Sequence, residues 1–178
     1  STNKLEIIKS NYFSILVNLI NLYLNHNQVR IIEEFSFFNL KKLTRIELEN
    51  NQINNLNNFT LNEANNLKDL FFSKNTIQKI TRDTFEKFNK LESIYLNENQ
   101  IIFIEEYSFR NLISLKNLVL YQNHIEILNQ NIFHEAINLI YLNVNKNKVK
   151  KIENQLFCNL TKLRTLDLSE NEINTIEE

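Results

Sequence analysis

The residues that could carry out catalytic or metal chemistry are few in this chain, and they are dispersed. Among 178 residues there are three histidines, His26, His124 and His134, and one cysteine, Cys158. Their separations match no metal-ligand spacing and no Cys/His or Ser/His/Asp arrangement. The single cysteine excludes an internal disulfide framework. We therefore expect no enzymatic activity, no cofactor and no metal.

The composition excludes further classes of site. The chain has no Gly, Pro, Met or Trp, so it cannot form a glycine-rich phosphate loop, a dinucleotide fingerprint or a G-x-S-x-G nucleophile elbow. Charge is balanced, with 20 Lys and Arg against 21 Asp and Glu. This balance predicts no nucleic-acid partner and no anionic membrane partner. The size and the 43% apolar content suit one domain with a sizeable core.

Asparagine is in excess, with 33 of 178 residues, and eight asparagines recur at intervals of 24 residues. This period defines one repeat domain over residues 1–178, and repeat position 1 is taken as the leucine that begins each unit. The recurring asparagines occupy position 9: Asn3, Asn27, Asn51, Asn75, Asn99, Asn123, Asn147 and Asn171. The predicted units are a partial unit 1–18, six complete units 19–42, 43–66, 67–90, 91–114, 115–138 and 139–162, and a partial unit 163–178.

Each unit combines a strand pattern with a return segment. Apolar and polar residues alternate around positions 3 to 7, which predicts a strand with one buried face. Apolar residues at positions 11, 14, 19 and 22 of the return segment complete the interior, with phenylalanine predominating at position 19. One unit cannot bury this set alone, so the units must stack into a solenoid with a parallel sheet on one side. The position-9 asparagines are expected to form a buried hydrogen-bonded ladder.

The pattern L-x-x-L-x-L-x-x-N-x-I-x-x-I-x-x-x-x-F-x-x-L-x-x resembles the leucine-rich repeat, in its 24-residue "typical" class. The stretches 163–176 and 115–133 match it closely. The resemblance implies an α/β-type repeat solenoid, a horseshoe or arc with a parallel sheet on its concave face and irregular or short helical convex segments. The plant subclass, with L-x-G-x-I-P, is excluded because the chain has neither Gly nor Pro.

The resemblance also implies a setting. The typical class is found mainly in animal extracellular proteins: Toll-like receptors of innate immunity, adhesion and guidance receptors, and matrix proteins. Such proteins bind macromolecules on the concave face and usually carry cysteine-rich caps, which are missing here. We therefore expect an uncapped segment of a larger secreted protein or receptor ectodomain.

Side chains at positions 3, 5 and 7 should point away from the core onto the concave face. Aromatic residues gather there at mid-solenoid, flanked by the charged residues Arg45, Glu47, Glu49, Asp69, Lys74 and Glu98. Exposed aromatics with a polar rim are typical of protein-binding hot spots, although aromatics also suit strand surfaces for purely structural reasons. The predicted ligand-binding residues are Tyr23, Phe71, Tyr95, Val119, Tyr121 and Tyr141.

Other surfaces carry weaker signals. Ile102, Phe103 and Ile127 follow the ladder and would either form a lateral dimer surface near Phe103 or pack partly against neighbouring turns. A lysine run from Lys146 to Lys151 is interpreted as a solvated edge, since a heparin-type patch needs basic residues on adjacent repeats as well. The segment 13–24 resembles a membrane segment, but its polar residues and its repeat register argue against insertion. Two N-glycosylation sequons begin at Asn58 and Asn159, no more than chance predicts.

Together these features predict a non-catalytic recognition module that binds a protein or another macromolecule on its concave face, in an extracellular setting. The alternatives are a structural or adhesive matrix protein and a segment of an intracellular scaffold. Because glycine is absent and asparagine is the best substitute at positive φ, we also expect part of the asparagine excess to serve turns.

Overall fold

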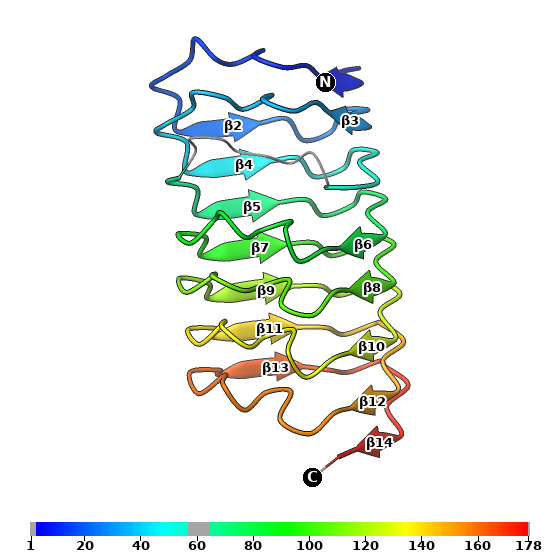
Figure 1. Ribbon diagram of the computed structural model, residues 1–178. Helices are drawn as coiled ribbons and strands as arrows, with labels where there is room; N and C mark the ends of the chain where they lie inside the picture. Colours follow the sequence, from blue (N-terminus) through cyan, green and yellow to red (C-terminus); the bar gives the residue numbers. More distant parts are fainter. Residues whose placement is uncertain (1–2, 57–64, 178) are drawn as a thin grey trace.

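The computed structural model describes residues 3–56 and 65–177. It is a stack of similar turns that runs from the N-terminal turn to the C-terminal turn, with one short strand along each side of most turns (Figure 1). No helix occurs in the described ranges, so the segments that return the chain are irregular there. The predicted parallel-strand repeat solenoid is confirmed.

Seven three-residue strands form the larger sheet, all parallel and in the order β13-β11-β9-β7-β5-β4-β2. Each strand pairs with its neighbour at a register shift of one repeat, as in Leu70↔Ile94. We call the solvent side of this sheet the sheet face. The strands are β2 (Asn21–Tyr23), β4 (Arg45–Glu47), β5 (Asp69–Phe71), β7 (Ser93–Tyr95), β9 (Asn117–Val119), β11 (Tyr141–Asn143) and β13 (Thr165–Asp167).

On the other side of each turn, two-residue strands pair in parallel in smaller sheets, β1-β3, β6-β8 and β10-β12-β14. In five of these seven strands the first residue is exposed and the second is buried, because position 14 faces the core. The strands are β1 (Ile7–Ile8), β3 (Ile31–Ile32), β6 (Lys79–Ile80), β8 (Phe103–Ile104), β10 (Ile127–Leu128), β12 (Lys151–Ile152) and β14 (Thr175–Ile176).

The core is one continuous column of aliphatic residues beside a spine of phenylalanines from position 19. Phe85, Phe109 and Phe133 stack with ring centroids 5.9 and 6.1 Å apart, and Phe157 continues the stack at 6.3 Å. The first three are buried. Because each ring meets the same ring of the next turn, the spine holds the turns in register.

From Asn27 to Asn171, the position-9 asparagines follow the carboxyl ends of the sheet-face strands, and their side chains form hydrogen bonds with the backbone there. Asn99 is typical: its Oδ1 accepts the Ile77 backbone N–H at 3.0 Å. Its Nδ2 donates to the carbonyls of Phe72 and Leu96, each at 3.0 Å, and of Asn97 at 3.3 Å. Two of these four partners belong to the preceding turn, so each amide links two units. The side chains from Asn51 to Asn147 are buried, while Asn27 and Asn171 are half-buried.

The turn just before the ladder asparagine has positive φ in the seven units from Asn27 to Asn171. Position 8 holds φ between 51° and 57°, in His26, Asn50, Lys74, Glu98, Gln122, Lys146 and Glu170. Only one of these seven is asparagine, and four of the thirteen positive-φ residues are asparagine in the described chain. Asparagine therefore serves some of these turns, and other residue types form the rest. The backbone hydrogen bonds of the stack hold position 8 in this conformation, for example Glu98 N–H to the Tyr121 carbonyl at 2.9 Å.

Candidate functional site

The centre of the sheet face is a three-layer stack of side chains from β4, β5 and β7. The Phe71 and Tyr95 rings lie parallel, with centroids 4.6 Å apart and planes 6° apart. On the other side of Phe71 the Arg45 guanidinium carbon lies 4.1 Å from the ring centroid. Phe71 and Tyr95 are register partners, so the strand spacing itself sets the stacking distance. We call Arg45, Phe71 and Tyr95 the central stack.

Two carboxylates hold Arg45 in place over the ring. Glu47 Oε1 accepts hydrogen bonds from Arg45 Nε at 2.8 Å and pairs with Nη2 at 2.7 Å, while Asp69 Oδ2 lies 3.9 Å from Nη1. Burial acts to lower the pKa of Arg45, but the hydrogen bond and charge of Glu47 together with the charge of Asp69 outweigh it and raise the pKa. Arg45 is therefore a fixed cation, which leaves a rigid surface rather than a flexible one.

Tyr121 lies on the unit that follows Tyr95 and hydrogen-bonds to Glu98. Its hydroxyl donates to Glu98 Oε1 at 3.3 Å, and Lys74 Nζ lies 3.8 Å from the same oxygen. Burial, and then the charge of Glu98, raise the pKa of Tyr121 above its ordinary value of 10.0. The phenol therefore stays protonated as a donor at neutral pH.

The remaining predicted ligand-binding residues differ in their placement. Tyr23 is 58% exposed, but its register partner is Glu47, so a carboxylate separates it from the central stack. Tyr141 is half-buried, and its hydroxyl oxygen accepts a hydrogen bond from Asn143 Nδ2 at 3.0 Å. Val119 is only 6% exposed, so it supports the surface and does not offer a contact area of its own.

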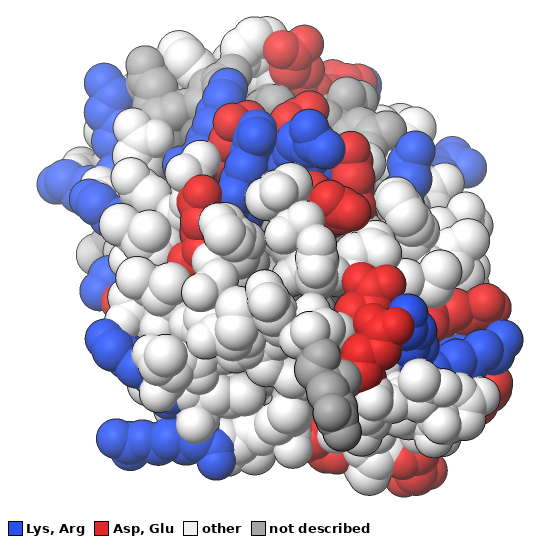
Figure 2. Space-filling model, turned by 60° about the horizontal axis from the view of Figure 1, so that its bottom comes forward, with Lys and Arg blue, Asp and Glu red and all other residues white. Residues whose placement is uncertain are grey.

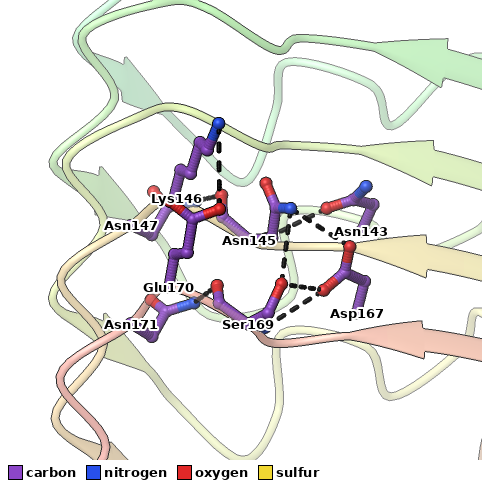
Figure 3. A network of polar contacts seen from close by, with 8 residues as sticks. All are labelled: Asn143, Asn145, Lys146, Asn147, Asp167, Ser169, Glu170 and Asn171. Atoms are coloured by element: carbon purple, nitrogen blue, oxygen red, sulfur yellow. Dashed lines mark hydrogen bonds and ion pairs between the residues drawn. The ribbon is translucent and has the colours of Figure 1, made fainter.

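The last two turns of the sheet face carry a polar network, which Tyr141 borders through its hydrogen bond with Asn143 (Figure 3). Asn145 Nδ2 donates to Asp167 Oδ2 at 3.2 Å and to Ser169 Oγ at 3.4 Å. Ser169 donates its hydroxyl and its backbone N–H to Asp167 Oδ1, at 2.6 and 3.0 Å. These bonds, led by that of the Ser169 hydroxyl, lower the pKa of Asp167. The network satisfies its own polar groups and leaves little for a ligand to gain.

The residues considered for catalysis do not meet. In residues 3–56 and 65–177 no three His, Cys, Asp or Glu side chains are grouped as metal ligands would be. His26 Nδ1 contacts Asn50 Nδ2 at 2.7 Å, and the ring of His134 packs edge-on against Tyr107. Cys158 is a free, exposed thiol. In the same ranges, no helix has the length and apolarity needed to cross a bilayer.

The weaker surface signals are placed on the opposite side of the turns. Ile102, Phe103 and Ile127 are 58%, 50% and 60% exposed, so neighbouring turns do not cover them. Asn58 lies outside the described residues. Asn159 is half-buried, and its Nδ2 donates to the His134 carbonyl at 3.2 Å.

Three of the four lysines in the run lie near acidic residues. Lys146 lies 3.8 Å from Glu170, Lys150 lies 3.9 Å from Glu126, and Lys151 lies 2.6 Å from Glu177, each measured from Nζ to a carboxylate oxygen. These pairs are those of a solvated edge.

Two sets of contacts were not anticipated from the sequence. The Arg45–Phe71 contact joins position 3 of one unit to position 5 of the next. Comparing residues at the same repeat position does not reveal such a diagonal pair, because its members occupy different positions on neighbouring strands. On the other side of the turns, carboxylates at position 15 accept the position-16 backbone N–H of the preceding unit. The signal was a second column at multiples of 24 residues: Glu33, Glu105, Glu153 and Glu177.

Comparison with known families identifies the class of protein that this stack of turns defines. The model of the "BspA type Leucine rich repeat region (6 copies)" matches residues 78–178, and the "Leucine rich repeat" model matches residues 1–53 and 41–101. The chain belongs to the leucine-rich repeat family, and its 24-residue period is compatible with the typical class. The membership points to a recognition fold. A comparison with curated proteins gives no significant match.

Solved structures with the same fold are parts of much longer chains. A TLR13–ssRNA13 complex matches with TM-score 0.70 and 27% identity, over 93% of this chain and 28% of that one. The leucine-rich repeats of FLRT2, in an octameric complex with latrophilin 3 and Unc5D, match with TM-score 0.77 and 27% identity, over 91% and 49%. The Toll–Spatzle complex of Drosophila matches with TM-score 0.85 and 20% identity, over 98% and 26%. This chain therefore spans less than half of each of those chains.

Proposed function

We propose that this chain is a non-catalytic recognition module that binds a protein ligand on the sheet face, as part of a secreted protein or a receptor ectodomain. The observation that carries the proposal is the central stack. An arginine and two aromatic rings are held rigid and half-exposed beside a rim of carboxylates and amides. Arg and Tyr are enriched among interface residues that dominate binding energy, and a rigid surface loses less entropy on binding.

The comparisons support this function without naming a ligand. FLRT2 is found in a complex with other proteins, and Toll is found with Spatzle. TLR13 is found with an RNA, but the sheet face here offers four acidic side chains, at Glu47, Glu49, Asp69 and Asp167, against one basic side chain at positions 3, 5 and 7. Such a surface repels a polyanion, so a protein ligand is favoured.

The test compares two triple variants of matched composition. Phe71→Ala, Tyr95→Ala and Tyr121→Ala remove the aromatic centre of the sheet face, while Tyr12→Ala, Phe103→Ala and Tyr107→Ala remove one Phe and two Tyr elsewhere. Proteins crosslinked to the wild-type chain on the surface of cells that express it are identified by mass spectrometry, and the affinity of each variant for them is then measured. The sheet-face variant should lose at least about 100-fold, or 2.7 kcal/mol.

Two results would count against the proposal. Equal binding by the wild type and the sheet-face variant, with circular dichroism showing both folded, would move the ligand elsewhere. A loss confined to the Phe103-containing variant would assign the interface to the opposite edge. The extracellular setting has its own test: secretion from animal cells followed by a glycosidase-sensitive mass shift that Asn58→Gln and Asn159→Gln together remove.

A further inference from the structure

A line of basic side chains runs along the edge where the chain enters the sheet-face strands. Two columns form it, repeat position 24 and position 2 of the next unit. Six of their side chains are basic and one, Glu92, is acidic, so this edge carries a net charge of +5 on a chain whose net charge is −1. We call it the loop edge, and its basic residues are Lys42, Lys68, Lys90, Lys116, Lys162 and Arg164.

The solenoid brings these charges together. The position-2 residues continue the parallel hydrogen bonding, with Glu92 N–H bonded to the Lys68 carbonyl and Lys116 N–H bonded to the Glu92 carbonyl. Their spacing is therefore about 4.8 Å per turn. Figure 2 shows the result: Lys and Arg side chains follow one another down the left side, where Figure 1 places the loops that enter the strands. Basic and acidic side chains mix on the right.

Most of these lysines are fixed without being neutralised. Lys42 and Lys90 donate from Nζ to the amide oxygens of Asn18 and Asn66 in the preceding turn, at 2.8 and 2.7 Å. Lys162 donates to Asn138 Oδ1 in the same way. An amide oxygen orients an ammonium group but leaves its charge in place.

Glu92 is the exception on this edge. Its carboxylate lies 2.7 Å from Lys116 Nζ and 3.1 Å from Lys68 Nζ, and these lysines remain 49% and 53% exposed. The loop edge thus differs from the lysine run at Lys146–Lys151, where three lysines each face an acid. It has basic residues on several successive repeats, which a polyanion site requires.

A hollow interrupts the line of charge between Lys116 and Lys162. It has a volume of about 370 Å³ and is lined by two isoleucines, two uncharged polar residues, two lysines and one acid: Ile113, Ile140, Ser114, Asn138, Lys116, Lys162 and Glu92. Apolar side chains with a hydroxyl, an amide and two cations suit a sugar ring that carries anionic groups. The Glu92 carboxylate in the same lining is paired with Lys68 and Lys116. Neither column contains an aromatic residue on which nucleic-acid bases could stack.

We propose that the loop edge binds a linear sulfated polysaccharide along the axis of the solenoid. The ammonium groups contact successive sulfates, and the hollow between Lys116 and Lys162 takes one sugar ring. The site is separate from the sheet face, so a ligand there and a protein on the central stack can bind together. It does not depend on the function proposed for the central stack.

The test uses heparin as the probe and two variants with the same loss of charge. The edge variant carries Lys68→Gln, Lys116→Gln and Lys162→Gln, and the control carries Lys146→Gln, Lys150→Gln and Lys151→Gln. The edge variant should bind heparin about tenfold more weakly, since exposed ion pairs contribute modestly. The slope of log affinity against log salt should fall by about three. The control should stay within twofold of the wild type.

A third variant should change heparin affinity in the opposite direction. Glu92→Gln removes the one acid of the loop edge and releases Lys68 and Lys116, so heparin affinity should rise severalfold. Equal affinities of the edge and control variants, or no heparin binding by the wild type, would overturn the proposal. Tighter binding to vesicles with phosphatidylserine, or to an oligodeoxynucleotide, would also overturn it and assign the edge to that ligand. Thermal unfolding checks that all variants fold.

Discussion

The asparagine ladder and the sheet face occupy neighbouring columns of the same repeat, yet they vary in opposite ways. Position 9 is asparagine in every unit, whereas position 5, four residues earlier, reads Tyr23, Glu47, Phe71, Tyr95, Val119, Asn143 and Asp167. The ladder residue faces the backbone of two turns, and the geometry of those turns is the same throughout. The position-5 residue faces solvent or a ligand. Uniformity therefore marks what holds the solenoid together, and variation marks what it can recognise.

The largest effect should come from breaking the ladder. Asn99→Leu removes one acceptor and three donor contacts and leaves buried backbone groups of two turns unsatisfied. We expect a loss of about 4 kcal/mol in the free energy of unfolding, measured by urea denaturation. Asn117→Leu is the sheet-face control, since that side chain makes one bond to Ser93 Oγ at 3.2 Å. It should cost less than about 1 kcal/mol. Similar losses would mean that the ladder is not special.

Two phenylalanines give the same comparison for apolar packing. Phe109 is fully buried between Phe85 and Phe133, so Phe109→Ala should cost about 3–5 kcal/mol. Phe71 is half-exposed, and Phe71→Ala should cost about 1 kcal/mol from the lost stacking and cation–π contacts. Urea titrations of both variants measure the difference. A larger cost at Phe71 would make the central stack a structural element.

Acid should weaken the polar network of the sheet face. The pKa of Asp167 lies below its ordinary 3.8 in the folded chain, because Ser169 and Asn145 donate to the carboxylate. Its contribution is therefore present above about pH 3.8 and is lost as the pH falls through the lowered pKa. The stability gap between the wild type and Asp167→Asn should shrink on acidification, and it should stay below about 1 kcal/mol throughout, because the network is exposed. Urea midpoints at several pH values measure the gap, and a constant gap contradicts the assignment.

The smallest effect concerns the positive-φ turn at position 8, between the sheet-face residue at position 5 and the ladder asparagine at position 9. Gln122 has φ of 55°, which is unfavourable for a residue with a Cβ. Gln122→Gly relieves this strain but raises the entropy of the unfolded chain, so we expect a net gain of about 0.5 kcal/mol. Gln100→Gly, at a residue whose own φ is not positive, should be destabilising. Thermal unfolding of the two variants distinguishes these outcomes.

Much of the fold could be predicted because the repeat converts spacing along the chain into spacing in space. Residues 24 apart are register partners, so a column such as Phe85, Phe109 and Phe133 could be expected to stack. The resemblance left irregular and short helical return segments open, and in the described residues they contain no helix. The turns with positive φ could not be assigned, because seven different local sequences adopt one conformation. Hydrogen bonds to the next turn impose it, whatever the residue type.

The candidate site was predicted less completely. Its column was clear from the alternation of apolar and polar residues, and Phe71 and Tyr95 lie together as neighbours in that column. The exposure of each side chain depends on what its neighbours cover, and the neighbours of Val119 leave it only 6% exposed. The contact of Arg45 with the Phe71 ring could not be predicted either, because it joins different repeat positions on neighbouring strands.

The sequence by itself determined the period, the ladder, the inside and outside of each turn, and the absence of glycine- or cysteine-based chemistry. These features are local sequence patterns that recur every 24 residues, so only one alignment of the repeat units is consistent with all of them. The tertiary structure alone decided which charges become neighbours. Lys68 and Lys116 are 48 residues apart in the chain, yet they share the carboxylate of Glu92 once the turns are stacked. The same stacking places Lys146, Lys150 and Lys151 each beside a different carboxylate. The loop edge has a single acid for six basic residues and therefore stays positively charged.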